Sequence, residues 1–376
     1  MEAHHQSSPA RTESGRLPSL DGLRAIAALL VVFAHSHVTV GWPGWRLLEE
    51  LRKTLSGFVA VQMFFVISGF IITRLLLNER TKVGSISLRR FWGRRFLRIV
   101  PPLAVYLACL SLLKALGAIE VSTLSQVGSL FFFRNHLPET DLFNIHCWSL
   151  SVEEQFYLIW PFCVAFLPLD KLRRVAWMVM VVAFLTRAAM NALGGTEWRW
   201  LIMQADCLMA GALAAFWLHK HGLHAVRRLS MGQSALHLGA LAGVLMLTRA
   251  SYTQISPWVA PIQPTAVAVF VACWIIRLVS LREGLVFRWL NNPLLVWLGT
   301  ISYSVYLWQE LISAPASHWL QGTPWFAHFP LNMLMSIVAG AISFYLLERP
   351  LQSLRHRWDS WLGVKTLSAS TSNVAS

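Results

Sequence analysis

Residues 20–37 read LDGLRAIAALLVVFAHSH, and this stretch decides what kind of protein the chain forms. A helix that crosses a bilayer needs roughly 20 mostly apolar residues, and this stretch supplies them after a short polar start. It is too long for the apolar part of a cleavable signal peptide, so it predicts a first membrane span that is retained. Two of its members, Arg24 and His35, stand out as ionisable side chains in an apolar segment.

The composition of the whole chain agrees with a membrane protein. Of 376 residues, 55% are hydrophobic and only 13% are Asp, Glu, Lys or Arg, whereas a soluble domain carries about 25% charged residues. We therefore predict an all-α fold, a polytopic helical bundle of about ten transmembrane helices in a lipid bilayer. The expected spans lie at approximately 20–41, 57–77, 97–116, 149–168, 174–191, 200–218, 232–248, 257–280, 293–313 and 328–347.

The segment 122–133 is apolar but too short to span, so an interfacial or re-entrant helix is expected there, with an eleventh span as the alternative. The distribution of positive charge favours ten spans with both termini cytoplasmic. On that assumption the cytoplasmic segments hold 22 of the 32 Lys and Arg residues, and the opposite loops hold six. Cytoplasmic loops of membrane proteins are enriched in Lys and Arg, and an eleventh span would remove the asymmetry.

The same asymmetry explains the net charge of +14 without nucleic acid as a partner. The five Cys residues are scattered and show no CxxC spacing, so neither a zinc site nor a disulfide framework is predicted. The 78–98 loop, by contrast, carries seven Lys and Arg residues. It is either a determinant of topology that contacts anionic lipid or a site for a phosphorylated ligand, because Arg binds phosphate bidentately.

Ionisable groups inside a membrane span are costly and indicate a functional site. His35 follows Arg24 by eleven residues, which returns a helix almost to the same face after about 16 Å of rise. His35, Glu153, Asp206 and Gln309 all fall at the same predicted depth, toward the non-cytoplasmic side. A histidine beside a carboxylate can serve as a general base, but it can equally relay protons in a transporter.

Seven motifs in this chain resemble, in order, those of the acyltransferase-3 family of membrane acyltransferases. They cover most of residues 17–350. The motifs are LDGLRAIAALLVVFAH, MFFVISGFIITRLL, RRFLRIVPPL, WSLSVEEQFYLIWP, ADCLMAGALAA, ISYSVYLWQ and LLERP.

The resemblance implies an enzyme with about ten spans that takes an acyl group, often acetyl, from cytoplasmic acyl-CoA as co-substrate. No permanently bound cofactor or metal is implied. The implied acceptor is a hydroxyl of a carbohydrate, a glycolipid or a small-molecule glycoside, often outside a bacterial inner membrane. Residues 20–350 would form the acyltransferase domain, between cytoplasmic tails at 1–19 and 351–376.

The family motifs also suggest roles for particular residues. Acyl-CoA is expected to dock on Arg24, Arg95 and Arg98, with His35 as the base, oriented by Glu153 or Asp206. The acceptor is expected to contact Trp148, Ser149, Ser151, Tyr303 and Gln309. Ser68, together with Ser149 or Ser151, is a candidate hydrogen-bond donor, with helix packing by small polar residues as the alternative role, while Gly69 and Gly211 are read as points of close helix packing.

The chain departs from the family pattern in places. Gln309 stands where the family often has His, which casts doubt on a second catalytic imidazole at that position. Gln204 stands where the family often has Arg, so we expect a change either in the acceptor contacts or in the pairing of Asp206. Some members of the family have an extracytoplasmic hydrolase-like domain after the last span, and we do not expect one in this sequence. The rival function is a secondary transporter, against which stands the lack of an inverted repeat.

Overall fold

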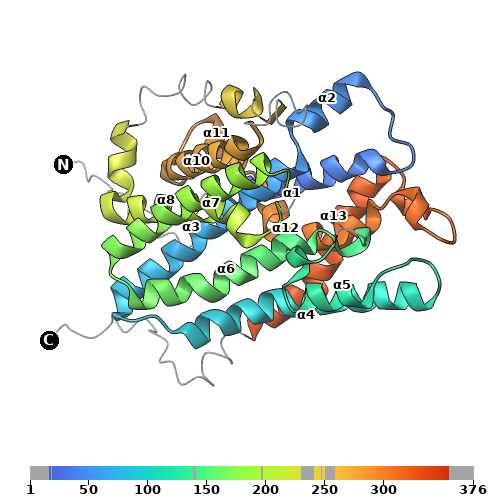
Figure 1. The fold of residues 1–376 in the computed structure, drawn as a ribbon, viewed down its shortest axis with the longest axis horizontal. Coiled ribbons are helices and arrows are strands. Elements are labelled where there is room, and N and C mark those ends of the chain that lie inside the picture. Colours follow the sequence, from blue (N-terminus) through green and yellow to red (C-terminus); the bar gives the residue numbers. More distant parts are fainter. Residues whose placement is uncertain are drawn as a thin grey trace, which may run out of the picture.

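The computed structural model describes residues 17, 19–138, 141–195, 198–229, 241–246, 248–249 and 259–354. This part of the chain is helical, and an isolated bridge between Val40 and His328 is the one β contact recorded in it. The helices, drawn in Figure 1, are α1 (Leu20–His35), α2 (Arg46–Thr54), α3 (Gly57–Val83), α4 (Leu88–Ala115), α5 (Thr123–Leu130), α6 (Cys147–Phe166), α7 (Leu169–Ala192), α8 (Leu201–Leu229), α10 (Val259–Ser280), α11 (Leu285–Leu290), α12 (Pro293–Ile312), α13 (Leu331–Ser343) and α14 (Arg349–Ser353).

Seven of the described helical segments are long and apolar enough to cross a membrane. They contain α1, α3, α4, α7, α8, α10 and α13. The predicted spans at 149–168 and 293–313 correspond to α6 and α12, which are 20 residues each but are not among these seven. The predicted span at 232–248 and the two predicted tails lie largely outside the described residues. The all-helical multi-pass fold is confirmed, and the count of ten and the orientation stay predictions.

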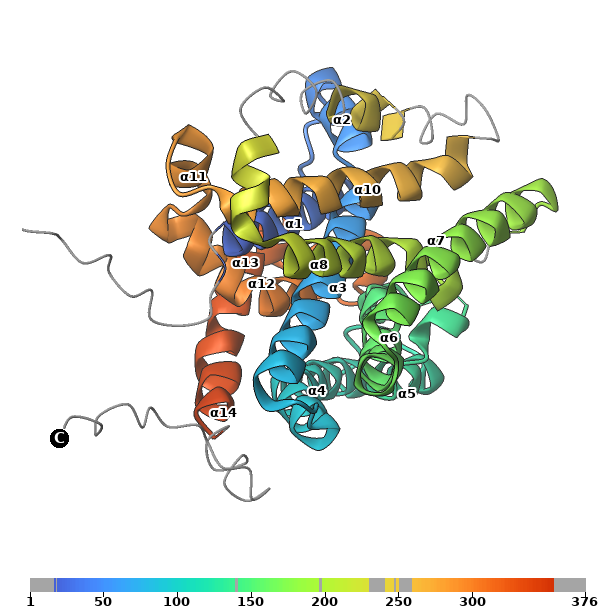
Figure 2. The ribbon, with the colours of Figure 1, turned by 90° about the vertical axis from the view of Figure 1, so that its left-hand side faces the viewer.

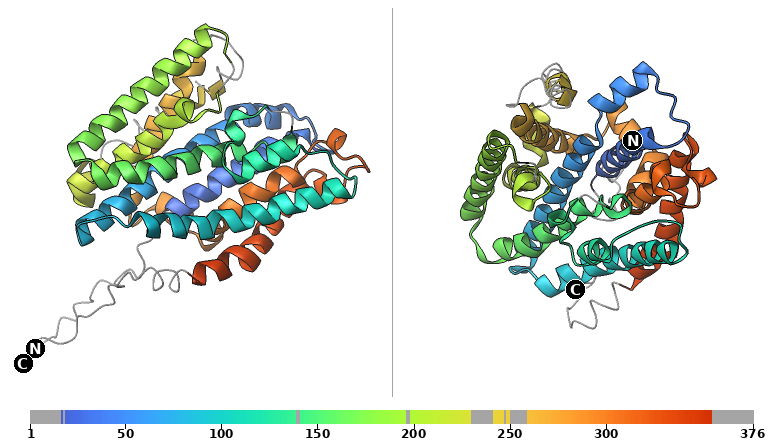
Figure 3. Two further views of the ribbon diagram at one scale, coloured as in Figure 1. Left: turned by 60° about the horizontal axis from the view of Figure 1, so that its bottom comes forward. Right: turned by 45° about the vertical axis from the view of Figure 1, so that its right-hand side comes forward.

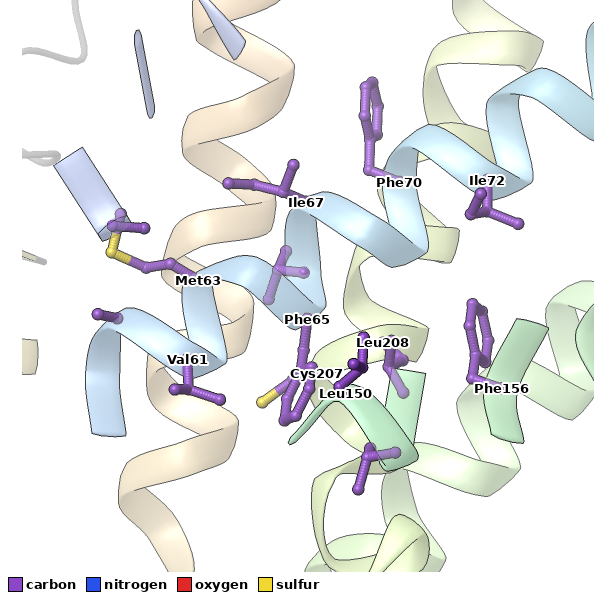
Figure 4. Close-up of a cluster of buried hydrophobic side chains, with 14 of the residues drawn as sticks. Val61, Met63, Phe65, Ile67, Phe70, Ile72, Leu150, Phe156, Cys207 and Leu208 are labelled. Carbon is purple, nitrogen blue, oxygen red and sulfur yellow. The ribbon is translucent and has the colours of Figure 1, made fainter. Parts of the chain in front are cut away.

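Helix α3 lies in the middle of the bundle. It packs against α8, α10 and α1, and on another side against α6 (Figure 2). Its buried apolar side chains include Phe65, Ile67 and Phe70, which meet Leu150 of α6 and Leu208 of α8 in one cluster (Figure 4). Because α3 is surrounded by protein, apolar residues on several of its faces are buried, in contrast to the single stripe of a surface helix.

Helices α3 and α8 approach to backbone contact, and each contributes a glycine there. A Cβ built on Gly69 would lie 2.0 Å from the carbonyl oxygen of Leu208, and one built on Gly211 would lie 2.0 Å from that of Val66. Small residues allow membrane helices to approach to backbone contact. Both glycines therefore act in close packing, as the sequence predicts.

We expect Gly211→Ala to destabilise the protein by about 1–3 kcal/mol, because the added methyl group forces the two backbones apart. The matched control is Gly243→Ala, since a Cβ there has nothing within 4 Å. Thermal unfolding of the purified protein in detergent measures both. Equal melting temperatures for the two variants would contradict the close-packing role of Gly211.

The two ends of the bundle differ in chemistry, and the long helices run from one to the other (Figure 3). At the end we call the basic end, Arg80 near the end of α3 donates to the carbonyl oxygens of Val164 and Leu167 where α6 finishes. At the other, the histidine end, a Cβ on Gly57 at the start of α3 would lie 3.8 Å from the His35 ring. The predicted site residues are distributed along the length between these two ends.

Candidate active site

A cavity of about 100 Å³ lies between α1, α3, α4, α6 and α12. Its wall contains six of the predicted site residues, one of them a tyrosine, together with two further tyrosines and several apolar side chains of α3. The predicted residues in this wall are Arg24, Arg95, Arg98, Ser149 and Glu153, and the tyrosines are the predicted Tyr303 together with Tyr157 and Tyr306. The tertiary structure thus brings together residues that are up to 282 positions apart, from Arg24 to Tyr306.

Positive charge dominates the polar part of this wall. Arg24, Arg95 and Arg98 all line the cavity, against the single carboxyl group of Glu153. Among the described residues, no hydrogen bond or ion pair engages the guanidinium groups of Arg24 and Arg98. Arg95 lies over the ring of Tyr157, 4.7 Å from its centroid. Arginines that line a cavity and whose guanidinium groups form no ion pair are suited to bind an anion such as phosphate.

Glu153 is held from two sides. Its Oε1 accepts a hydrogen bond from Ser68 at 2.7 Å, and its Oε2 accepts one from the hydroxyl of Tyr157 at 3.3 Å. Ser68 therefore donates a hydrogen bond, as expected, and it does so to a carboxylate of the site. The two contacts fix Glu153 in the wall of the cavity between α3 and α6.

Hydroxyl groups form the wall further toward the histidine end. The hydroxyls of Ser149 and Tyr306 are hydrogen-bonded at 2.5 Å, and Tyr306 also donates to the carbonyl oxygen of His146 at 3.1 Å. Tyr303 donates to the carbonyl oxygen of Ile99 at 2.8 Å, which joins α12 to α4. These contacts position α12 against α4 and α6.

His35 is not part of the cavity wall, but it pairs with a residue one helical turn beyond that wall. Its Nε2 lies 3.6 Å from Oε2 of Glu310, and Glu310 follows Tyr306 by one turn on the same face of α12. Arg24 and His35 belong to the same stripe of α1, with Arg24 in the wall and His35 beyond it. The imidazole is 36% exposed, so it remains accessible.

The expected carboxylate partners of His35 were Glu153 and Asp206, and the structure pairs it with Glu310 instead. Asp206 is fully buried on α8 and forms an ion pair with Arg187 of α7, with N–O distances of 2.9 and 2.5 Å. Thr265 of α10 donates to the same carboxylate at 2.7 Å. Asp206 therefore joins three helices outside the cavity, and Gln204 donates to the carbonyl oxygen of Trp198.

Three predicted acceptor contacts also lie outside the cavity wall. Trp148 is buried among the rings of Phe58, Phe65 and Trp198. Ser151 is fully buried and donates to the carbonyl oxygen of Cys147, as helix-packing serines do. Gln309 is fully buried and donates to Glu310 at 2.8 Å.

Sequence reasoning missed Glu310, Tyr306 and Tyr157 as members of the site. Tyr306 and Glu310 are four residues apart, so the helical period would have shown that they share a face. The signal for Glu310 was its charge inside a predicted span, which by itself indicates a functional site. Tyr157 stands in the same relation to Glu153, four residues later on α6.

Comparison of the sequence with known proteins places the chain in a family. A model of an acyltransferase domain matches residues 17–349. The chain is 27% identical to the peptidoglycan O-acetyltransferase OatA of Listeria monocytogenes over 368 residues, and 29% identical to the proposed peptidoglycan O-acetyltransferase YrhL of Bacillus subtilis over 376 residues. These alignments cover 89% and 90% of the chain but 56% and 55% of the relatives, so the chain spans about half their length.

A proposed O-acetyltransferase of Staphylococcus aureus is 27% identical over 358 residues, which are 89% of this chain and 57% of that protein. No solved structure matches the chain. The family model extends from three residues before α1 to the first residue of α14, and it includes every residue of the cavity wall. The chain therefore belongs to the acyltransferase-3 family of O-acyltransferases.

Proposed function

We propose that this protein moves an acyl group, acetyl in the first instance, from acyl-CoA to a hydroxyl of a glycan. The observation that carries this proposal is the cavity with three arginines in its wall and an imidazole–carboxylate pair one helical turn beyond it. The proposed setting is a bacterial inner membrane with both termini in the cytoplasm, where acyl-CoA is made. Relatives named as peptidoglycan O-acetyltransferases support a carbohydrate acceptor.

In this proposal the basic end binds the donor. The 3′-phosphate and pyrophosphate of coenzyme A carry several negative charges, and Arg95 and Arg98 near the start of α4 supply the cations. Arg24 extends the positive wall along α1. The pantetheine arm then follows the cavity past Ser68 and Glu153 toward Tyr306, and it carries the thioester toward the histidine end.

His35 is the proposed general base. Its Nε2 removes the proton from the acceptor hydroxyl, and the oxygen attacks the thioester carbonyl carbon. The carbon–sulfur bond breaks, and the departing thiolate takes up the proton from Nε2, so atoms and charges balance. Ser149 and Tyr306 present hydroxyls near this end, and when Tyr306 gives up its bond to the carbonyl oxygen of His146 it can donate to the oxyanion of the tetrahedral intermediate.

Donor binding tests this proposal most directly. Arg95→Gln and Arg98→Gln are each expected to raise the KM for acetyl-CoA about tenfold, because each removes a charge-assisted contact with phosphate. Arg89→Gln is the matched control, because Arg89 is exposed on the same helix and does not line the cavity. Thiol release and isothermal calorimetry with acetyl-CoA measure the effect on the purified protein in nanodiscs.

An equal effect of all three arginine substitutions would mean that the loop attracts CoA only by its total charge. If the wild-type protein does not bind acetyl-CoA, the acyltransferase proposal is overturned for this chain. Proton-coupled uptake into proteoliposomes would then be the next measurement, since the rival transporter needs no acyl donor.

A further inference from the structure

The hydrogen bond of His35 within its own helix determines which of its nitrogens is the base. Nδ1 lies 2.9 Å from the carbonyl oxygen of Val31, one turn earlier on α1. A carbonyl oxygen only accepts, so Nδ1 carries the hydrogen. The neutral ring therefore has its lone pair on Nε2, the nitrogen that faces Glu310. The backbone of α1 thus performs the task that a carboxylate performs in a Ser-His-Asp triad, and it fixes the tautomer.

Glu310 is placed beside the reactive nitrogen and is itself held there. Its Oε2 lies 3.6 Å from Nε2 of His35 and accepts a hydrogen bond from the amide of Gln309 at 2.8 Å. The side chain of Glu310 is 10% exposed, so its charge is screened little by solvent. The two helices that carry this pair also pack closely elsewhere along their length, since a Cβ on Gly299 would lie 1.9 Å from the carbonyl oxygen of Asp21.

We propose that Glu310 is a positioning residue that acts through His35 by stabilising the imidazolium formed during acyl transfer. The inference rests on the proposed function and deepens it. When Nε2 takes the proton of the acceptor hydroxyl, the ring becomes positive within 3.6 Å of the carboxylate, and the attraction lowers the barrier. When the thiolate takes that proton, the ring is neutral again, and Glu310 is unchanged throughout.

The same geometry gives Gln309 a defined part. Its amide nitrogen donates a hydrogen bond to Glu310, while its Oε1 is buried and has no hydrogen-bond partner among the described residues. The reversed amide would place Oε1 against the carboxylate oxygen, where the two would repel, so the assigned orientation is the favourable one. Gln309 therefore holds the carboxylate that faces His35.

The test is a double-mutant cycle on acetyl-CoA-dependent turnover with soluble peptidoglycan fragments as acceptor. Glu310→Gln is expected to lower kcat about 10- to 100-fold and to leave the KM for acetyl-CoA within about twofold, because the donor binds at the basic end. Glu310→Asp keeps the charge and is expected to recover at least half of the loss on a logarithmic scale. In the His35→Ala background, Glu310→Gln is expected to cause no further loss.

Glu50→Gln serves as the matched control, since Glu50 is a carboxylate of α2 paired with Lys53 and Arg249 away from the cavity. Its kcat is expected to equal that of the wild type. An unchanged kcat in Glu310→Gln, or an equal loss with and without His35, would overturn the role of Glu310. If His35→Ala is fully active, the role of His35 as base fails together with that of Glu310, while acyl transfer stands. If the wild-type protein shows no acetyl-CoA-dependent turnover, the proposed function itself fails, so the failures are distinguishable. The Glu310→Asp variant decides the question if Glu310→Gln does not fold.

Discussion

His35→Ala is expected to lower the kcat for acetyl transfer by about 10³-fold, within the range that general bases contribute. The variant loses the only described imidazole that lies within ion-pair distance of a carboxylate. The KM for acetyl-CoA is expected to change little, because the arginines proposed to bind the donor line the cavity, whereas His35 lies outside its wall. Release of free thiol by purified protein in nanodiscs, at equal folded yield, is the measurement.

His37→Ala is the matched control for this prediction. His37 lies two residues after His35, and its Nδ1 is bonded to the carbonyl oxygen of Ala34, so it has a similar local environment without a carboxylate partner in the described structure. We expect wild-type turnover from it. Equal losses in both histidine variants would point to damage at the end of α1 and would remove the assignment of His35 as base.

Asp206→Ala is expected to destabilise the protein by about 3–5 kcal/mol, because it leaves the buried guanidinium of Arg187 without its ion-pair partner. Both side chains are at most 8% exposed, and the pair ties α7 to α8 while Thr265 adds α10. The expected observation is a large fall in the melting temperature in detergent. At a temperature where the variant is folded, donor KM is expected to be unchanged.

The comparison for Asp206 is a salt bridge on the surface. Asp170→Ala breaks the pair with Arg173 in α7, where the Asp170 side chain is 77% exposed. Solvent screens such pairs, so we expect a loss below about 1 kcal/mol. A folded, stable Asp206→Ala protein with lost turnover would contradict the structural role of Asp206 and support the catalytic role that its sequence motif suggests.

What lies within one helix was accessible from the sequence. The apolar runs predicted the helices, because a membrane span must satisfy its backbone internally and so leaves a long apolar signature. The shared stripe of Arg24 and His35 follows from the fixed rotation of about 100° per residue. The hydrogen bond from His35 to Val31 is of the same kind, since it joins residues one turn apart.

What lies between helices was decided only by the tertiary structure. Predicted depth placed His35, Glu153, Asp206 and Gln309 at the same level of the bilayer, but depth leaves the rotation of each helix and its neighbours open. Glu153 accepts a hydrogen bond from Ser68, Asp206 forms an ion pair with Arg187, and Glu310 lies within ion-pair distance of His35. The partner of each carboxylate depends on which helices are in contact and at which residues. The sequence does not reveal these contacts, because apolar surfaces that face lipid and those that face another helix look alike in sequence. The helices of a membrane protein are thus local properties of its sequence, whereas the pairing of its buried charges is a property of the packed bundle.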